Sequence, residues 1–334
     1  MKGPPAPRHS QARVGPLQGA TGDRVSVRVP ATSANLGPAF DSAGLALAQY
    51  DVVDVTVVGS GLSVEVTGVG AGELPTDESH LVVRAFRAAC DELGWTPPGL
   101  RFAARNGIPQ GRGMGSSAAA VVAGVMSARA LCPDVEAIDL NAVLRLTTAM
   151  EGHPDNVAAC LLGGFTLTWQ RPDDVGVEVL RVHDEVLPVV LVPDATLSTS
   201  VARGLLPDAV PHGDAAFNAG RSALLVHALT TQPSRLLEAT EDRLHQQQRR
   251  PAMPDSLALI DRLRDAGHAA VVSGAGPSVL VLAQRLHGDP ADPAGAARVR
   301  EVARLVPEGW SVLPLGVDVQ GARLDRPPQE VSSS

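Results

Sequence analysis

The stretch Ile108–Ala120, IPQGRGMGSSAAA, sets glycine at every second position ahead of two serines and an alanine- and valine-rich run. Glycine at this density, at Gly111, Gly113 and Gly115, suits a backbone that needs left-handed or close-approach conformations. Serine is a good N-cap, so a helix is expected to start directly after the two serines. A glycine-rich loop that opens a helix directs free N–H groups and the positive end of the helix dipole to one point. The stretch therefore predicts a phosphate site.

Other loop types fit this stretch less well. A Walker P-loop needs GxxxxGK[ST], and the segment has no lysine. Gly113-x-Gly115-x-x-Ala118 satisfies the loose dinucleotide pattern, but a buried strand should precede such a loop, and the preceding ARNGIPQ is polar and contains Pro109. A serine-hydrolase elbow needs GxSxG, which the segment does not spell. A flexible turn ahead of a core helix is the remaining structural alternative.

Composition limits the class of protein. The 334 residues suggest two domains, and 44% hydrophobic content is ample for folded cores. The longest apolar runs fall short of the roughly 18–20 residues of a membrane span. A net charge of −8 with dispersed acids and bases argues against a nucleic-acid surface. Cys90, Cys132 and Cys160 lack CxxC spacing, which suits a reducing cytosol and excludes a disulfide framework or cysteine zinc cluster.

Alternating strands mixed with grouped amphipathic helices predict an α+β fold rather than a doubly wound parallel sheet. Residues 1–22 are expected to be a disordered extension without a signal-peptide core, and residues 323–334 a disordered tail. A charged, less patterned stretch at residues 171–185 separates an N-terminal domain, 23–185, from a C-terminal domain, 186–322. Strands are expected at residues 24–29, 51–58, 62–66, 101–104, 165–169 and 186–192, and near 273–276 and 311–317. Helices are expected at residues 79–93, after the serines, at 139–150, and near 215–230, 234–245, 256–266 and 294–305. A further short helix is expected with Pro154 in its first turn and Gly163–Gly164 at its end.

Further segments place polar residues beside turns. These are PATSANLGPAFD (30–41), EGHPDN (151–156), LSTSVARGLLP (197–207) and a second glycine loop with a buried strand, SGAGPSVLVLA (273–283). Together with the first glycine loop, they resemble the three ordered motifs of the GHMP kinase superfamily. EGHPDNVA, STSVAR and LHQQQR (244–249) are similar in particular to the branch that phosphorylates homoserine. The resemblance covers about residues 24–322.

The resemblance implies a two-domain α+β fold, with an N-terminal domain like ribosomal protein S5 domain 2 and a ferredoxin-like C-terminal domain. It implies an ATP- and Mg²⁺-dependent phosphorylation of the side-chain hydroxyl of L-homoserine, which supplies O-phospho-L-homoserine for threonine biosynthesis. The expected partners are therefore the small molecules L-homoserine and ATP, and neither a nucleic acid nor a membrane is expected as a partner. Many members are homodimers, which leaves a homodimer open for this chain.

By the same resemblance, the glycine loop holds the phosphates of ATP through backbone N–H groups, with a serine hydroxyl and a glutamate on Mg²⁺. The metal ligands would be Ser117 and Glu151, and hard oxygen ligands of this kind are what Mg²⁺ prefers. The expected ATP-binding residues are Pro109, Gln110, Gly111, Arg112, Gly113, Met114, Gly115, Ser116, Ser117 and Ala118.

A free amino acid needs a carboxylate for its ammonium group and a cation for its own carboxylate. The resemblance implies that Asp41 and Asp155 face the ammonium group, and that Arg203 and Arg249 hold the carboxylate, where planar bidentate geometry favours arginine. Only the spacing to Pro254 favours Arg249 over its neighbour Arg250. The same resemblance assigns the remaining substrate pocket to Asn35, near the reacting hydroxyl, and to His153, Asn156 and Gly276.

Asn35, Asn156 and Arg203 are the expected catalytic residues, but the sequence assigns no general base. Many members of the superfamily have an aspartate that could take the substrate proton, whereas this chain has Asn156 in that stretch. Direct transfer of the hydroxyl proton to phosphate or solvent is then expected. His80 stands where relatives often have an asparagine near adenine, which makes a strict preference for ATP an open question.

Two alternatives remain at this point. Another small-molecule kinase of the superfamily, such as one acting on mevalonate, would have no ammonium group to bind, which argues against it given Asp41. A catalytically silent ligand sensor of the same fold would have no need of the metal ligands Ser117 and Glu151.

Overall fold

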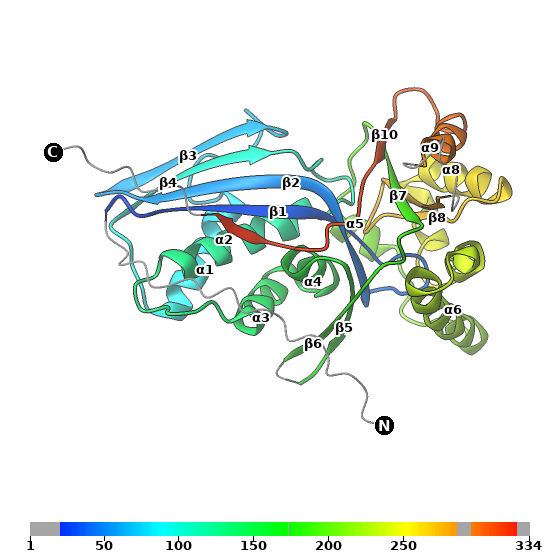
Figure 1. Cartoon of the computed structure of the whole chain (residues 1–334), viewed down its shortest axis with the longest axis horizontal. Coiled ribbons are helices and arrows are strands. Elements are labelled where there is room, and N and C mark those ends of the chain that lie inside the picture. The colour runs from blue at the N-terminus through cyan, green and yellow to red at the C-terminus, as the bar shows by residue number, and fades with distance from the viewer. Residues whose placement is uncertain (1–20, 173, 286–294, 326–334) are drawn as a thin grey trace.

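The computed structural model describes residues 21–172, 174–285 and 295–325, and it has the expected α+β architecture with two separate sheets (Figure 1). The larger sheet consists of β1 (Arg24–Ala34), β2 (Ala43–Val57), β3 (Gly61–Gly68), β4 (Gly99–Asn106), β5 (Phe165–Gln170), β6 (Val175–Leu180) and β11 (Arg323–Asp325). Its strand order is β11-β1-β2-β4-β3, and β5 joins β2 to β6. Within it, β3 and β4 run parallel and the other pairs antiparallel.

Four helices pack below this sheet in the view of Figure 1: α1 (Leu81–Leu93), α2 (Ser116–Leu131), α3 (Leu140–Glu151) and α4 (Asp155–Leu162). Helix α2 is buried around most of its circumference, as expected for a helix of alanine and valine at the centre of a domain. Gly124 lets α1 approach closely, because a Cβ there would lie 2.4 Å from the Val82 carbonyl oxygen. The glycine loop therefore leads into the best-packed helix of the domain.

The second sheet consists of β7 (Val186–Val192), β8 (Ala270–Val272), β9 (Val279–Gln284) and β10 (Ser311–Pro314), in the antiparallel order β10-β7-β9-β8. Helix α8 (Pro254–Asp265) connects β7 to β8, and α9 (Ala296–Ala303) connects β9 to β10. This βαββαβ succession and its strand order form the ferredoxin-like arrangement that the family resemblance implied for the C-terminal domain. The first sheet ends with β6 at Leu180 and the second begins at Val186, so the chain changes sheets between them.

The insertion between β7 and α8 carries the remaining helices: α5 (Thr199–Gly204), α6 (His212–Thr230), α7 (Leu236–Ala239) and the 3₁₀ helices η1 (Pro233–Arg235) and η2 (Gln247–Ala252). The predicted helix at residues 234–245 is wrong in its second half. The chain leaves helical geometry after Ala239, because the carboxylate of Asp242 accepts from the backbone N–H groups of Leu244, His245 and Gln246 and so fixes a turn.

Three further details differ from the sequence expectations. Strand β6 lies within the stretch 171–185 that was expected to be unpatterned, and β8 and β9 flank the second glycine loop rather than include it. Arg323–Asp325, expected in a tail, pairs with β1. Residues 1–20 and 326–334 of the termini that were expected to be disordered lie outside the described residues. Gly22, at the end of the expected N-terminal extension, donates its backbone N–H to Val57 O. In the described part of the chain, every helix is too short or too polar to cross a membrane.

Candidate active site

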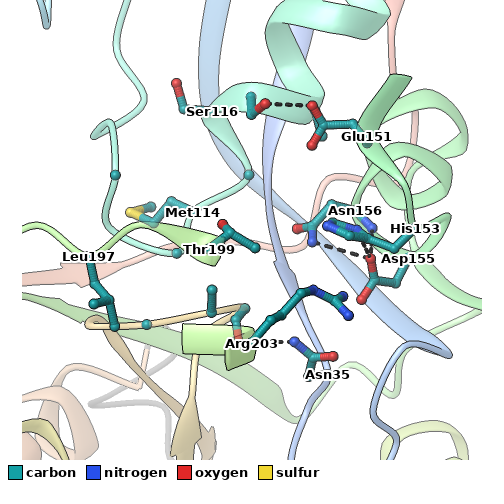
Figure 2. Close-up of a pocket in the computed structure, with 18 of the residues that line it drawn as sticks. Asn35, Met114, Ser116, Glu151, His153, Asp155, Asn156, Leu197, Thr199 and Arg203 are labelled. Carbon is teal, nitrogen blue, oxygen red and sulfur yellow. Dashed lines mark hydrogen bonds and ion pairs between the residues drawn. The ribbon is translucent and has the colours of Figure 1, made fainter. Parts of the chain in front are cut away.

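The three motif loops meet in one cavity at the junction of the two sheets, where α5 also arrives (Figure 2). Gly274 of the second glycine loop donates its N–H to Ala34 O, and Thr32 donates its N–H to Met114 O. The Ser273 hydroxyl lies 2.7 Å from Gly113 O. These bonds join segments that are far apart in sequence, so the cavity is framed by backbone contacts before any ligand enters.

The glycine loop has the backbone conformations that its composition predicted. Gly111, Gly113 and Gly115 all have positive φ, at 62°, 70° and 69°. Two of them also permit close contact, because a Cβ on Gly113 would lie 2.1 Å from Ser273 O and one on Gly115 would lie 1.9 Å from Thr32 Oγ1. Gly115, not a serine, is the N-cap of α2. The serine N-cap prediction is therefore wrong: the serines begin the helix, and the cap position needs a left-handed backbone.

The first turn of α2 has the free N–H groups that are expected of an anion site. The N–H of Ala119 is the first to bond back into the helix, to Gly115 O, so the N–H groups of the residues before it face outward from the helix end. They are directed into the cavity that Ser116, Ser117 and Ala118 line. A phosphate group at this position would meet both these donors and the helix dipole.

Ser117 and Glu151 bring two oxygen ligands together at the same end of the cavity. Ser117 Oγ donates to Glu151 Oε1 at 2.5 Å, whereas Ser116 points away from Glu151 in Figure 2. Glu151 is the last residue of α3, so two helix ends converge here. A hydroxyl and a carboxylate side by side, next to a phosphate-binding helix end, are a donor set that fits Mg²⁺, which takes few ligands from protein and the rest from phosphate and water.

The opposite end of the cavity is lined by Arg203, Arg249 and Asp155, whereas the predicted Asp41 lies outside the lining and is connected to it through Arg203. Arg203 of α5 donates to both carboxylate oxygens of Asp41, at 2.5 and 3.1 Å, and the guanidinium carbon lies 5.3 Å from the Phe40 ring centre. The hydrogen bond to Asp41 raises the pKa of Arg203. The pair is about one third exposed, so a ligand from solvent can reach it.

Asp155 is a buried carboxylate with one oxygen left over. Its Oδ1 accepts from the backbone N–H of Asn156 at 2.8 Å and contacts His153 Nδ1 at 2.9 Å. Within the described residues Oδ2 is buried and has no hydrogen-bond partner. The hydrogen bond to Asp155 raises the pKa of His153. A buried carboxylate oxygen without a donor is costly, so Oδ2 is a suitable acceptor for a cationic ligand.

Asn156 and Asn35 are both held by neighbouring groups. Thr32 Oγ1 donates to Asn156 Oδ1 at 2.8 Å, which orients the amide. Asn35 donates to Gly274 O at 2.9 Å and accepts from the Asp41 N–H at 3.0 Å. Asn35, Leu36 and Asp41 all have positive φ, which is strained for these residue types and typical of functional loops.

The structure distinguishes Arg249 from Arg250. The Arg249 side chain is buried and lines the cavity, where Nη1 donates to Gly274 O at 3.3 Å. Arg250 instead bonds to Asp261 at 2.8 Å on the exposed face. Burial, together with the charge of Arg203, lowers the pKa of Arg249 to about 10. The charge of Arg249 is therefore poorly compensated and favours an anion in the cavity.

Most of the sequence-predicted site residues thus lie around one cavity. The predicted residues that line it are Asn35, Pro109, Gly111, Gly113, Met114, Gly115, Ser116, Ser117, Ala118, Glu151, His153, Asp155, Asn156, Arg203, Arg249 and Gly276. Sequence reasoning missed Leu197, Thr199, Gly274 and Ala275, although all four lie within the segments 197–207 and 273–283 that the sequence had already singled out. Arg112 does not direct its side chain to this cavity, because it donates to the carbonyls of Pro193 and Asp194 at 2.9 Å each.

A second cavity adjoins the first through Gly111, Ser116 and Ser117. Its walls are mostly apolar, with polar groups from Asp51, Ser79, His80, Asn106 and Gln110. His80 caps α1 through Nδ1, which accepts from the Val82 N–H, and burial lowers the pKa of His80. A mostly apolar cavity beside the glycine loop has a lining that suits an apolar ring.

Comparison with known proteins agrees with this geometry. The chain matches the family model of the GHMP kinase N-terminal domain over residues 80–164 and that of the GHMP kinase C-terminal domain over residues 225–305. It is 53% identical to a homoserine kinase of Streptomyces avermitilis over 299 residues, which cover 89% of this chain and 94% of that protein. It is 54% identical to a homoserine kinase of Clavibacter michiganensis subsp. michiganensis over 304 residues, covering 91% and 94%. The crystal structure of homoserine kinase from Cytophaga hutchinsonii superposes with a TM-score of 0.77 at 26% identity, covering 92% and 98%.

Proposed function

The chain belongs to the homoserine kinase family of the GHMP kinases, and from this membership we propose that its cavity transfers the γ-phosphoryl group of ATP to the side-chain hydroxyl of L-homoserine. The observation that carries the proposal is that one cavity contains both a candidate site for phosphate and metal and a candidate site for an amino acid. The N-terminus of α2 lies at one end of the cavity together with Ser117 and Glu151. Arg203, which forms an ion pair with Asp41, lies at the other end.

The nucleotide half binds through main-chain donors. The triphosphate lies along the glycine loop, with N–H groups of the first turn of α2 on its oxygens, and the base enters the adjoining apolar cavity. Ser117 and Glu151 hold Mg²⁺, which neutralises phosphate charge when it is bound. Phosphoryl transfer then depends on positioning and charge more than on covalent help from the protein.

The amino-acid half recognises a zwitterion. Arg203 and Arg249 bind the carboxylate of homoserine, and Asp41 and the unpartnered Oδ2 of Asp155 take its ammonium group. In the free protein Arg203 and Asp41 form an ion pair with each other. When homoserine binds, this pair is replaced by two, one between Arg203 and the substrate carboxylate and one between Asp41 and the substrate ammonium group. Asn35 and Asn156 orient the hydroxyl, and an amide has no basicity to accept its proton. The proton therefore passes to phosphate or solvent.

The proposal is tested by following ADP release from ATP and Mg²⁺ with homoserine or mevalonate as the acceptor. Release that depends on homoserine supports it. Release with mevalonate alone would assign the chain to a different small-molecule kinase activity. Binding of homoserine and ATP without any release would make the protein a ligand sensor.

A matched pair of variants tests the metal site. Glu151→Gln removes a charged ligand and is expected to lower kcat at least about 100-fold, as loss of a group that stabilises developing charge typically does. Glu65→Gln makes the same chemical change at an exposed position on β3 and should keep kcat within about twofold. Full ADP release by Glu151→Gln would refute the metal assignment while leaving the substrate assignment standing.

A further inference from the structure

Among the described residues, the hydrogen-bond partners of the Arg249 guanidinium are neutral groups, and they bond to Nε and Nη1. Its Nε donates to Ala202 O at 3.3 Å, and its Nη1 donates to Gly274 O at 3.3 Å and faces His245 Nδ1 at 3.2 Å. These bonds use Nε and Nη1 and leave the Nη2 end for a ligand in the cavity that Arg249 lines. The direction of that end therefore depends on what holds Nη1.

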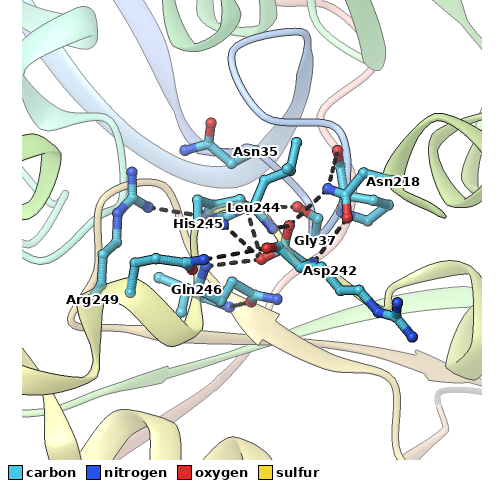
Figure 3. Close-up of polar contacts among 12 residues, drawn as sticks. Asn35, Gly37, Asn218, Asp242, Leu244, His245, Gln246 and Arg249 are labelled. Carbon is cyan, nitrogen blue, oxygen red and sulfur yellow. Dashed lines mark hydrogen bonds and ion pairs between the residues drawn. The ribbon is translucent and has the colours of Figure 1, made fainter. Parts of the chain in front are cut away.

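The His245 ring has a defined tautomer. Its Nε2 lies 2.6 Å from Gly37 O, and a carbonyl oxygen can only accept, so Nε2 has the proton (Figure 3). In a neutral ring Nδ1 then has a lone pair, which accepts from Arg249 Nη1. The ring is fully buried and stacks against Phe40 with 5.0 Å between ring centres. His245 thus connects the loop of residues 35–41, which follows β1, to the arginine.

The backbone that presents His245 is fixed by Asp242. This carboxylate is fully buried and accepts from the N–H groups of Leu244, His245 and Gln246 and from Asn218 Nδ2. Asn218 in turn donates to Pro38 O at 3.2 Å, so α6, the Asp242 turn and the loop of residues 35–41 form one connected network. Such a fully bonded buried network restricts its members to one arrangement.

We propose that His245 is a positioning residue: as the neutral Nε2-protonated imidazole it holds Arg249 in register with the loop that carries Asn35 and Asp41, and so sets the affinity for the substrate carboxylate. The inference rests on the proposed function, because it acts through the carboxylate of homoserine. Its signature is a loss of homoserine affinity without a matching loss of ATP affinity.

The charges around His245 favour the neutral ring. Burial lowers the pKa of His245, and the facing Arg249 charge lowers it further, against the opposing effects of Asp242 and Asp41. Protonation would place an N–H donor at Nδ1 against the guanidinium, which would break the bond and push Arg249 away. Because its pKa is lowered, His245 becomes protonated only below the ordinary histidine value of about 6.5, and the affinity for homoserine should fall in that lower pH range.

Two substitutions separate the two bonds of the ring. Asn at this position reaches the site of Nδ1 and offers an acceptor to Arg249, whereas Gln reaches the site of Nε2 and offers a donor to Gly37 O. We expect His245→Gln to raise the KM for homoserine about tenfold, the scale of one hydrogen bond to a charged group, and His245→Asn to raise it less than about threefold. The KM for ATP should stay within about twofold in both variants. His227→Gln, at an exposed histidine of α6, is the matched control and should change neither value.

The test substrate 3-amino-1-propanol separates this role from general damage, because it is homoserine without the carboxylate. If His245 acts through Arg249, His245→Gln should leave kcat/KM for this amine unchanged while reducing kcat/KM for homoserine. The part of the low-pH fall that occurs below the ordinary histidine pKa should also disappear in His245→Asn, whereas any change caused by His153, whose pKa is raised, should remain.

An unchanged homoserine KM in His245→Gln, or equal losses in both variants and with both substrates, would overturn the inference. That failure is distinguishable from failure of the proposed function, since the latter would appear as absent homoserine-dependent ADP release in the unsubstituted protein. Thermal unfolding of each variant identifies any loss that comes from misfolding instead.

Discussion

Gly115 and Gly61 have similar left-handed backbones but different surroundings, and this difference separates conformational strain from steric need. Their φ angles are +69° and +78°, but a Cβ on Gly115 would lie 1.9 Å from Thr32 Oγ1, whereas one on Gly61 meets nothing within 4 Å. Gly61→Ala should therefore cost about 1–2 kcal/mol of unfolding free energy, the usual cost of a left-handed alanine. Gly115→Ala should cost at least about 2 kcal/mol more, because Thr32 must also move. Urea unfolding measures both.

The same pair tests the role of the glycine loop in binding. Gly115 caps the helix whose first-turn N–H groups are proposed to bind the phosphates, so a displaced loop should raise the KM for ATP at least about tenfold in Gly115→Ala, whereas Gly61→Ala should leave it unchanged. Equal stability losses with equal ATP kinetics would mean that Gly115 serves backbone conformation alone.

Asp51 is an acid that reduces stability at neutral pH. Burial raises its pKa to about 6 despite hydrogen bonds from the N–H groups of Gly107 and Ile108. The unfolded chain has an aspartate pKa near 3.9, so the folded state binds this proton more tightly. The protonated Asp51 carboxyl therefore contributes its full stability below about pH 4. This contribution to the free energy of unfolding, about 3 kcal/mol in all, is lost as the pH rises through 6.

Asp51→Asn keeps an acceptor for both N–H groups and removes the ionisation. We expect this variant to be more stable than the unsubstituted protein by about 2–3 kcal/mol at pH 7, with the difference vanishing near pH 4. Urea unfolding between pH 4 and pH 8 measures it. A constant difference across that range would contradict the assignment. Asp51 lines the cavity proposed for the base, and an acid with this cost is typical of a position kept for function.

At the scale of elements, α5 is a short helix with a functional residue at its end. Its six residues are too few to be stable without a cap, and Ser198 provides one by accepting from the Val201 N–H. Ser198→Ala should weaken α5 by about 1 kcal/mol and raise the KM for homoserine about three- to fivefold, because Arg203 leaves its position. Ser234→Ala, at an exposed serine of η1, is the control, because the Ser200 hydroxyl bonds to that of Ser198. Steady-state kinetics with homoserine varied would show the difference, and equal KM values in the two variants would rule it out.

The predictability of each element follows from how local its stabilising contacts are. Helices α1 to α4 were predictable because each buries apolar residues at a helical spacing or over nearly its whole surface. Strand β11 was not, since it has three residues and depends on β1 at the other end of the chain. The leucines of residues 234–245 also have a helical spacing, but the side chain of Asp242 ends the helix, and its partners are not visible in that pattern.

At the scale of the whole molecule, the site was predictable in its motifs but not in its assembly. The glycine loop, Asp41 and Glu151 lie in motifs whose residue types indicate their chemistry. The choice between Arg249 and Arg250 depended on burial, which the sequence left to the spacing from a proline. The contacts of Arg112 with the segment after β7 were also hidden, because backbone carbonyls leave no mark in the side-chain pattern.

Arg112 joins the two halves of the molecule, because it lies in the glycine loop of the first domain and donates to the carbonyls of Pro193 and Asp194 where the second begins. Arg112→Ala leaves these carbonyls without their donors and should cost about 1–3 kcal/mol. It should also raise the KM for ATP severalfold, because the loop loses its anchor. Arg101→Ala, at an exposed position on β4, is the control.

Variants that retain only Trp95, in the first domain, or only Trp310, in the second, report the unfolding of each half by fluorescence. The two transitions should coincide with Arg112 present and separate in Arg112→Ala, because cooperativity between domains depends on the contacts that cross their junction. Coincident transitions together with an unchanged KM for ATP would show that other contacts at the junction, such as the bond from Leu197 N–H to Gly111 O, are sufficient to couple the domains.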